Sequence, residues 1–496
     1  MSKRRVLSLS LAALLALPAL AGAAGARKPP HPSRAKLQPC TVPTLGKDAD
    51  ALCGTYEVWE NRAAKSGRRI DLAIVLLPAR SAQPKPDPIF FLAGGPGQSA
   101  TELAAALARD DLRRARDFVF VDQRGTGKSN PLQCDLGGND DDVQSYLGEM
   151  FPVDAVRKCR ERLAKVADLT LYTTDVAMDD LDEVRAWLGY DRINLAGGSY
   201  GTRAAQVYLR RHPQSVRAAV LSGVVPMDEV LPLSHAAGGQ RSLDLLLGWC
   251  EKDAACHAKF PRIREDFAAV MDRLAQGPVT VEIRHPRTGK PVPARLSREL
   301  VAEGIRWMLY NPGDGARLPL RVHQAANGDF APLGQASVAA RIGMARVLAL
   351  GLLFSITCAE DIPYIDPAQV PARTAGSFLG DYRVRQQMAA CSVWPRARVA
   401  PDHREALRSD VPVLLVSGER DPVTPPGFGM RVARHLTRAV HVIVPWGSHG
   451  SDDPCIDRIQ KEFIDRGSGE GLDTSCVSRI QRTPFVLEKP KGETAP

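Results

Sequence analysis

Short apolar runs alternate with helix-like segments between residues 89 and 222, and this alternation limits the possible folds more than any other feature of the chain. The apolar runs end in glycine-rich or polar turns and cover residues 89–92, 118–121, 193–196 and 219–222. Such runs are typical of strands that are buried on both faces. Segments with helical spacing separate them, at residues 101–108, 174–188 and 202–211. Strands that alternate with helices predict an α/β fold, in which helices flank a mostly parallel sheet.

The alternation stops after residue 225 and returns only near the C-terminus. Residues 227–404 are mostly helix-like, whereas strand-like apolar runs reappear at 413–417 and 440–444. An inserted domain is the simplest explanation for a sheet that is interrupted in this way. We therefore predict an α/β core formed by residues 27–225 and 406–496, the second part carrying a C-terminal extension, with a mainly helical insertion at residues 226–405.

The N-terminus has the layout of a secretory signal peptide. Basic residues at positions 3–5 precede an apolar run, and a stretch of small residues follows it. A membrane anchor is the alternative, but Pro18 interrupts the run and small residues close it. We predict that residues 1–26 form a signal peptide, cleaved after Ala23 or Ala26. The mature protein would then be periplasmic or extracellular, without attachment to the membrane.

The chain contains ten cysteines, an even number that an oxidising compartment allows to pair. Neighbours in the sequence close loops at the least entropic cost. This favours Cys40 with Cys53, Cys134 with Cys159, Cys250 with Cys256, Cys358 with Cys391, and Cys455 with Cys476. A zinc site is the alternative at Cys250, Cys256 and His257, but no second Cys/His pair stands at zinc spacing. We predict disulfides, and neither a metal nor another cofactor.

The charge of the chain gives no sign of a nucleic-acid partner. The formal net charge is +9, and removal of residues 1–26 takes away three basic residues and no acid, which lowers it to +6. The excess is scattered, with no basic run of five or more residues and no basic stripe interleaved with aromatics. With 44% hydrophobic and 24% charged residues, the composition is that of an ordinary globular protein. It does not indicate an oligomeric state.

A candidate nucleophile stands in Gly197-Gly198-Ser199-Tyr200-Gly201, which fits the G-x-S-x-G pattern. The motif lies between a predicted strand and a predicted helix. A serine on such a sharp turn needs small neighbours, because the backbone is crowded there, and the turn holds the hydroxyl up into a site. The alternative is a glycine-rich turn with only a structural role. The position at a strand–helix junction favours Ser199 as the nucleophile.

A serine hydroxyl needs a base to take its proton and an acid to orient that base. His449 lies in a loop directly after the strand-like run 440–444, whereas His435 is in a helical segment and His441 is inside that run. Asp421 follows the run 413–417, with Glu419 as the rival acid. The order Ser199, Asp421, His449 is that of α/β-hydrolases.

An oxyanion formed at Ser199 needs two donors that point at the developing charge. The backbone N–H of Tyr200, directly after the serine, is the first candidate. The second is expected from the turn Ala93-Gly94-Gly95-Pro96-Gly97, where glycines let the backbone approach a substrate closely. We favour Gly95 over Gly94; a simple tight turn explains the three glycines around a proline less well.

Three motifs together resemble those of the prolyl aminopeptidase and tripeptidyl aminopeptidase family of α/β-hydrolases. They are Gly94-Gly95-Pro96-Gly97, then Asp122-Gln123-Arg124-Gly125, then Gly197-Gly198-Ser199-Tyr200-Gly201. The resemblance continues at residues 418–425 and 447–450, so it covers the core on both sides of the insertion. Ala93 and Tyr200 stand where the prolyl enzymes usually have His and Trp. The exported, cysteine-bearing chain is more similar to the tripeptidyl aminopeptidase branch.

The resemblance implies an α/β-hydrolase fold whose helical insertion is a cap over the active site. In such a cap, acidic residues can bind the free N-terminal ammonium of a peptide, which makes the enzyme an exopeptidase. Glu360 and Asp361 are the candidates of first choice, with Glu229 and Glu251 as further candidates and solvated surface charge as the alternative. The family also implies a structural role for Asp122 and Arg124.

Three functions are compatible with these residues. The first is a serine exopeptidase that releases N-terminal residues or short peptides from substrates with a free N-terminus. The second is an esterase or lipase with the same three residues, since both reactions pass through an acyl-enzyme. The third is an inactive binding module, which would have no reason to keep Ser199, Asp421, His449 and the glycine turn together. An epoxide hydrolase or dehalogenase of this fold would need an Asp in place of Ser199.

Overall fold

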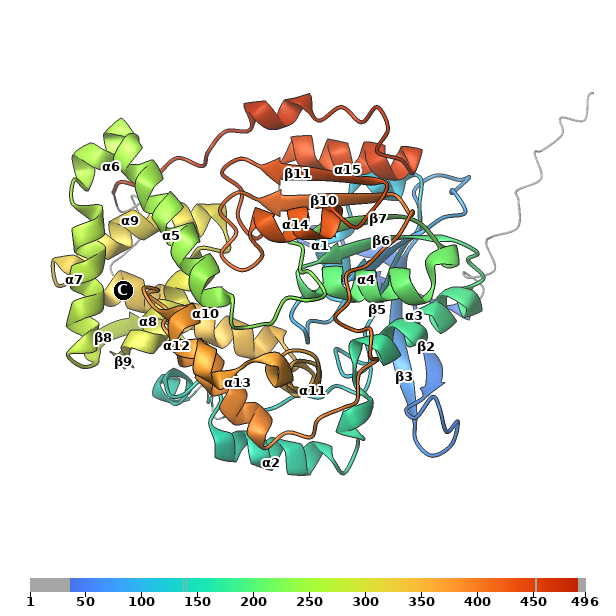
Figure 1. Cartoon of the computed structure of the whole chain (residues 1–496), viewed down its shortest axis with the longest axis horizontal. Coiled ribbons are helices and arrows are strands. Elements are labelled where there is room, and N and C mark those ends of the chain that lie inside the picture. Colours follow the sequence, from blue (N-terminus) through green and yellow to red (C-terminus); the bar gives the residue numbers. More distant parts are fainter. Residues whose placement is uncertain (1–35, 137, 140, 451–452, 489–496) are drawn as a thin grey trace, which may run out of the picture.

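The computed structural model describes residues 36–136, 138–139, 141–450 and 453–488, so the predicted signal peptide lies outside the described residues. Nine strands of this part of the chain form one sheet, in the order β1-β2-β3-β5-β4-β6-β7-β10-β11 (Figure 1). Neighbours from β5 to β11 run parallel, and β1, β2, β3 and β5 pair antiparallel. The strands are β1 (Gln38–Val42), β2 (Ala49–Trp59), β3 (Arg69–Leu77), β4 (Ile89–Leu92), β5 (Phe118–Val121), β6 (Ile193–Gly198), β7 (Val216–Ser222), β10 (Val413–Gly418) and β11 (Ala439–Val444).

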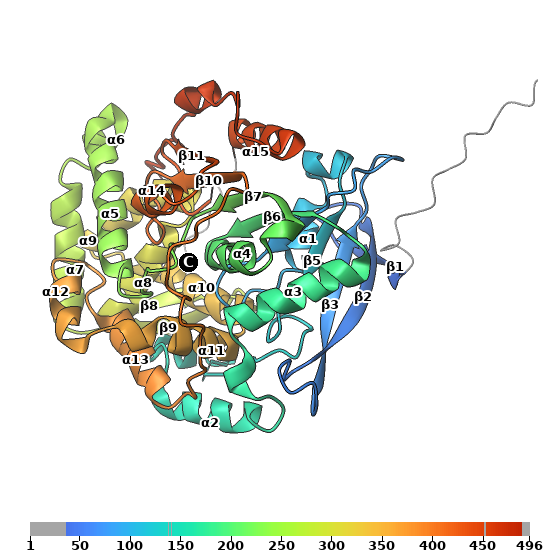
Figure 2. The same cartoon turned by 45° about the vertical axis from the view of Figure 1, so that its right-hand side comes forward.

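Both faces of the sheet are buried, as the apolar runs predict. In β5, Phe118 and Phe120 join the hydrophobic cluster on one face, while Val119 and Val121 join the cluster on the other. Figure 2 shows α3 and α4 lying across the second of these faces. The helices of the core are α1 (Leu103–Leu107), α3 (Thr174–Leu188), α4 (Tyr200–Arg211), α14 (Pro426–Ala433) and α15 (Pro454–Arg466). The predicted α/β fold with a mostly parallel sheet is confirmed.

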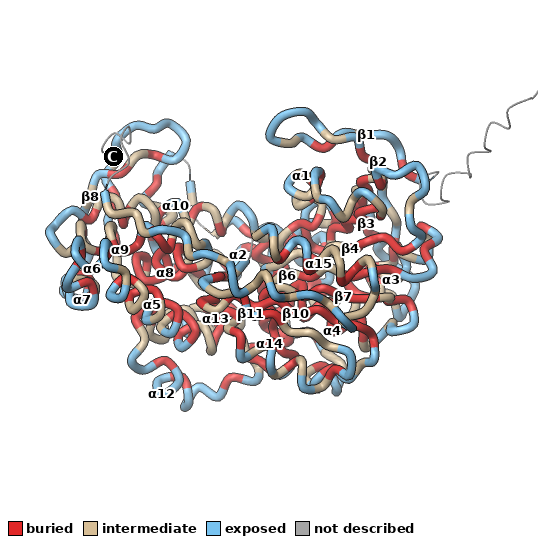
Figure 3. Tube along the Cα trace, turned by 90° about the horizontal axis from the view of Figure 1, so that it is seen from above, coloured by how far each residue is buried: buried red, intermediate tan, exposed pale blue. Residues whose placement is uncertain are grey.

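The segment between β7 and β10 forms a mainly helical body beside the sheet, with one antiparallel hairpin, β8 (Val279–Arg284) and β9 (Pro291–Leu296). This body, which we call the cap, has a hydrophobic cluster of its own, and Figure 3 shows buried segments on both sides of the molecule. Its helices are α5 (His235–Lys252), α6 (Ala254–Lys259), α7 (Ile263–Ala275), α8 (Arg298–Met308), α9 (Pro312–Ala326), α10 (Ala331–Val347), α11 (Leu350–Glu360), α12 (Val370–Thr374) and α13 (Tyr382–Ser392).

The packing of three segments crosses the predicted domain boundaries. Helix α2 (Val153–Leu163) precedes the insertion in sequence but packs against α11 and α13. Conversely, α11 belongs to the insertion, yet every residue of it is buried, and Leu352 and Phe354 join the cluster under the sheet. Phe485, near the C-terminus, packs against the cluster of the cap. The cap therefore contacts the core through these segments as well as through the two chain segments that connect it to β7 and β10.

Five disulfides link the cysteines, and their pairing is the predicted one in every case. Each bridge joins neighbours in the sequence, with separations from 6 to 33 residues. Cys358–Cys391 connects α11 to α13. Among the helices of the described residues, none combines the length and the apolar character that crossing a membrane requires.

Candidate active site

Ser199 sits on the turn between β6 and α4 with a backbone φ of 54° and ψ of −123°, a conformation that L-residues rarely adopt. Glycines on both sides make this turn possible. A Cβ on Gly197 would lie 2.5 Å from the carbonyl oxygen of Gly201, and a Cβ on Gly201 would lie 2.1 Å from the carbonyl oxygen of Leu92. The spacing of the motif is thus a steric requirement of the turn, and it presents Ser199 at the carboxyl edge of the sheet.

Asp421 and His449 lie close together at the same edge, after β10 and β11. The carboxylate oxygen Oδ2 of Asp421 is 2.9 Å from His449 Nδ1. Asp421 is fully buried, and it also accepts hydrogen bonds from the N–H groups of Val423 and Thr424, both at 2.8 Å, and from the Thr424 hydroxyl at 2.6 Å. Burial raises the pKa of Asp421, but His449 and the Thr424 donors outweigh it and lower the pKa below its ordinary value. Asp421 is therefore an ionised, fixed partner for the imidazole.

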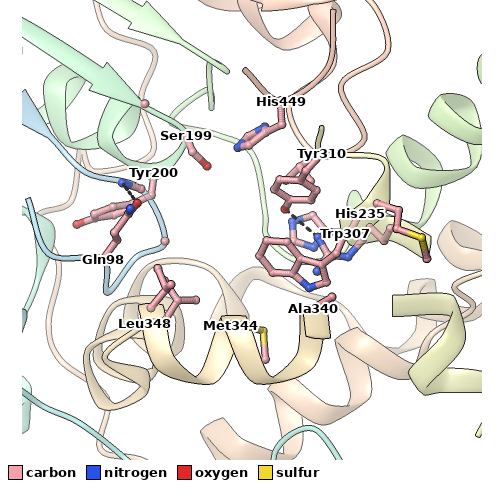
Figure 4. Close-up of a pocket in the computed structure, with 18 of the residues that line it drawn as sticks. Gln98, Ser199, Tyr200, His235, Trp307, Tyr310, Ala340, Met344, Leu348 and His449 are labelled. Carbon is pink, nitrogen blue, oxygen red and sulfur yellow. Dashed lines mark hydrogen bonds between the residues drawn. The ribbon is translucent and has the colours of Figure 1, made fainter. Parts of the chain in front are cut away.

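The imidazole of His449 is also held from its other sides. The ring of Tyr310 meets it edge-to-face with 4.6 Å between the centroids. The backbone N–H of His449 donates to the Tyr310 carbonyl at 3.2 Å, which fixes the loop that carries the ring. Gly223 leaves room for the ring, since a Cβ there would lie 3.3 Å from His449 Cε1. Because Nδ1 of His449 faces Asp421, Nε2 is the ring nitrogen that can act in the cavity. Figure 4 shows the Ser199 hydroxyl and the His449 ring pointing toward one another.

The turn after β4 and the start of α4 both border the space in front of Ser199. Gly95 has a φ of 112°, which favours glycine, and a Cβ on it would lie 2.6 Å from the Gly97 nitrogen. The N–H of Gly94 already donates to Gln98 Oε1 at 3.3 Å (Figure 4). This bond leaves Gly95 as the better donor candidate of the two. Tyr200, the other predicted donor, is the first residue of α4, directly after Ser199.

The side chain of Tyr200 anchors that end of α4 in the core. Its hydroxyl bonds to Thr174 Oγ1 at 2.9 Å and to Gln123 Nε2 at 3.1 Å. Burial raises the pKa of Tyr200, and the nearby Glu360 raises it further. Tyr200 therefore stays a neutral hydrogen-bonding group, and its backbone N–H is held in a fixed position.

Asp122 and Arg124 are structural, as the family resemblance implies. Asp122 is fully buried and accepts from Ser99 Oγ at 2.7 Å and from the Thr101 N–H at 2.9 Å, which ties the loop after β5 to the glycine turn after β4. Arg124 is also fully buried and forms a bidentate pair with Asp180 at 2.6 and 2.9 Å. Neither residue lines the main cavity.

The two predicted amine-binding acids differ in their placement. Glu360 does not line the cavity; its oxygens accept from the Thr174 N–H and hydroxyl, both at 2.8 Å, and it lies 3.3 Å from His403 Nε2. This position does not support contact between Glu360 and a substrate, because its carboxylate is used inside the protein. Asp361 does line the cavity, with its oxygens 2.9 and 3.1 Å from Arg203 Nη1.

A cavity of about 1210 Å³ lies between the sheet edge and the cap, and Ser199 and His449 both border it. Opposite Ser199, its wall is apolar and includes Met344 and Leu348 from α10 and the segment after it (Figure 4). The volume exceeds the roughly 300–1,000 Å³ of typical small-molecule pockets, which suits a chain-like substrate. No group of three or more His, Cys, Asp or Glu that could hold a metal occurs in the described part of the chain.

Several residues of the cavity were not anticipated from the sequence. Four of them line it from the cap: His235, Arg306, Tyr310 and Arg383. Thr424, which is not part of the lining, donates a hydrogen bond from its hydroxyl to Asp421. The four cap residues belong to three different helices or their ends, so no spacing in the sequence connects them. Only Thr424, three residues after Asp421, stands near a recognised motif.

The fold of the chain is that of the α/β-hydrolases. The family model described as alpha/beta hydrolase fold matches residues 87–248, and the model described as TAP-like protein matches residues 376–476. These matches lie in the two parts of the core and extend into the cap.

Named relatives narrow the class further. Serine protease Hip1 of Mycobacterium tuberculosis is 25% identical over 88% of this chain and 90% of that protein. A tripeptidyl aminopeptidase of Streptomyces coelicolor is 28% identical over 87% of this chain and 84% of its own length. Carboxylesterase B of Mycobacterium tuberculosis is 27% identical, with 78% of each chain covered. The predicted resemblance is thereby confirmed at the level of the family: the chain is a hydrolase related to the serine peptidases of this fold.

Proposed function

We propose that the protein is an exported serine exopeptidase that releases N-terminal residues or short peptides through an acyl-enzyme. The observation that carries the proposal is the 2.9 Å contact between Asp421 and His449, with the imidazole facing Ser199 on its strained turn. In this proposal Ser199 is the nucleophile, His449 is the general base and then the general acid, and Asp421 orients and stabilises the imidazolium.

The reaction follows from these positions. His449 Nε2 takes the proton of the Ser199 hydroxyl as Oγ attacks the scissile carbonyl carbon. The N–H groups of Tyr200 and Gly95 stabilise the oxyanion, since they border the space in front of the hydroxyl. His449 then gives its proton to the leaving amine, and the C–N bond breaks. Water, activated by the same imidazole, hydrolyses the ester on Ser199 and restores the enzyme.

The position of the cap supports an exopeptidase rather than an enzyme that cuts long chains internally. Residues of the cap and of the sheet edge line the same cavity, so the cap limits the directions from which a substrate reaches Ser199. Asp361 is the predicted acid that lines this cavity, and we propose that it shares its carboxylate between Arg203 and the ammonium of the substrate. The similarity to a tripeptidyl aminopeptidase supports the same substrate class.

An esterase is the second candidate, and the apolar wall formed by Met344 and Leu348 supports it. Such a wall suits acyl chains, and one relative is named a carboxylesterase. Initial rates on a panel of aminoacyl and tripeptidyl anilides beside short-chain p-nitrophenyl esters distinguish the two. Faster turnover of tripeptidyl anilides, abolished in Ser199→Ala, supports the peptidase; turnover of the esters alone would reassign the enzyme.

A further inference from the structure

The wall of the cavity on the cap side contains an arginine without an acidic partner. Arg383, on α13, lines the cavity, and among the described residues no carboxylate lies within ion-pair distance of its guanidinium. Its Nε is buried without a hydrogen-bond partner, and its Nη1 meets only the sulfur of Met150. The guanidinium also lies over the ring of Phe151, 4.9 Å from the centroid. Most of its donors therefore have no strong acceptor within the protein.

His235 lies in the same part of the cavity, and its side chain also lacks hydrogen-bond partners. It is the first residue of α5, it borders the cavity, and both of its ring nitrogens are buried without a hydrogen-bond partner. Burial lowers the pKa of His235 well below its ordinary value, and the charges of Arg306 and Arg383 lower it further. The imidazole is therefore neutral at pH 7 and has one N–H to donate.

The surroundings of these two side chains carry an excess of positive charge. Arg306 and Arg341 both interact electrostatically with Arg383, whereas Glu303 is the acid that faces them. That acid is already paired with Arg306 at 2.8 Å. Burial lowers the pKa of Arg383 to about 10, with Arg306 adding to the effect. A guanidinium desolvated without a counter-charge is unfavourable, and an anion that binds beside it removes the penalty.

This cationic group is close to the reacting residues. Tyr310 connects the two: its ring meets that of His449, and its hydroxyl accepts a hydrogen bond from Arg306 Nη1 at 2.8 Å. Figure 4 shows His235, Trp307 and Tyr310 together on the side of the cavity that faces His449. Arg383, His235 and Ser199 thus line one cavity, which a single bound molecule can occupy.

We propose that Arg383 and His235 form a subsite for a carboxylate of the substrate. Arg383 supplies charge and paired N–H donors, and His235 adds a neutral N–H donor. The carboxylate comes either from an acidic side chain or from the free C-terminus of a short peptide, which have the same chemistry. The inference rests on the proposed function and names its substrate class: peptides that carry a negative charge near the cleaved bond.

Substrate pairs that differ only in charge test this subsite. One pair is Ala-Ala-Glu p-nitroanilide against Ala-Ala-Gln p-nitroanilide, and the same exchange is made at the two preceding positions. The other pair is tetra-alanine with a free C-terminus against its C-terminal amide. We expect kcat/KM to favour the charged member of one series by about 10- to 100-fold, and the series that shows it identifies the source of the carboxylate.

Variants separate recognition from structural support. Arg383→Gln should abolish the preference and leave kcat/KM for the neutral members within about threefold, with an unchanged or higher Tm, because a desolvated charge is removed. Arg385→Gln is the matched control: it lies on the same helix, but it is exposed and paired with Asp381. It should keep the wild-type preference. Equal rates on both members of every pair in the wild type, or an equal loss on all substrates in Arg383→Gln, would overturn the proposal.

A failure of the peptidase assignment can be recognised separately. If the enzyme hydrolyses only esters, inhibition of p-nitrophenyl acetate hydrolysis by glutarate is compared with inhibition by glutaramide. Stronger inhibition by glutarate that is lost in Arg383→Gln would support the subsite although the proposed peptidase function had failed. Equal inhibition by the two compounds would reject the subsite as well.

Discussion

At the sheet edge, Asp421 is fully hydrogen-bonded, whereas two side chains of the cap wall have buried nitrogens without partners. Asp421 receives three donors besides His449, all from residues within three positions of it in sequence. On the cap wall, His235 and Arg383 have buried nitrogens without partners. We propose that the core supplies the chemistry, while the cap wall contacts a group of the substrate.

The largest effect is expected from removing the machinery of the core. Ser199→Ala and His449→Ala should each lower kcat by about 10⁴- to 10⁶-fold, because only oxyanion stabilisation and binding remain. The double variant should lose little more than either single one, since the two residues act as a unit. Steady-state rates measure the loss, and circular dichroism checks that the fold is retained. Activity in Ser199→Ala within tenfold of wild type would refute the assignment of the nucleophile.

A smaller effect is expected when the substrate loses the group that the cap is proposed to recognise. Acetylation of the N-terminus of a tripeptidyl anilide removes a charge-assisted bond and leaves an acid unpaired, which should cost about 2–5 kcal/mol. The rate should then fall by about 30-fold to several thousand-fold at equal length. Asp361→Asn should remove most of this discrimination. Equal rates on free and acetylated substrates would contradict an exopeptidase and favour the esterase.

Removing a disulfide is expected to change the free energy of unfolding, by an amount that differs between a bridge that joins the cap to a helix under the sheet and a bridge within the cap. Cys358–Cys391 spans 33 residues and ties α13 to a helix that is buried under the sheet, whereas Cys250–Cys256 spans 6 residues within the cap. Replacing each pair by Ala should lower the free energy of unfolding by about 4 and about 2 kcal/mol respectively, because the longer loop restricts the unfolded chain more. Urea denaturation measures both losses. The reverse order would show that native packing, not loop length, decides their contribution.

The smallest effect concerns a buried histidine where core and cap meet. His403 lies 3.7 Å from Asp175 of α3 and 3.3 Å from Glu360 of α11. Burial lowers its pKa, but the two nearby carboxylates outweigh this and raise the pKa to about 9. Since the folded pKa is raised, the stabilisation is complete below pH ~6.5 and is lost as the pH rises toward 9. We expect a loss of about 1–3 kcal/mol across that window, measured by urea denaturation, and a flat profile in His403→Gln. An unchanged profile in the variant would assign the loss to another group.

The difference between core and cap also explains how much of the fold and of the site could be predicted from the sequence. In the core, a parallel strand carries its site residue at its carboxyl end, so the runs before Ser199, Asp421 and His449 made these residues candidates. The fold and all five disulfide pairs are confirmed, because apolar runs and short loop closures are local signals. The sequence identifies Glu360 only as an acid of the insertion, and tertiary packing decides whether its carboxylate faces the cavity or Thr174. His235 and Arg383 meet for the same reason, and no local pattern connects them.

Covalent labelling shows whether Ser199 of the core is the nucleophile of the cavity. A fluorophosphonate reacts with an activated serine, and mass spectrometry of the digested protein identifies the modified residue. We expect one adduct on Ser199, absent in Ser199→Ala and formed at least about 100-fold more slowly in His449→Ala, where the base is missing. An adduct on a different serine, or equal labelling of the wild type and His449→Ala, would contradict this expectation.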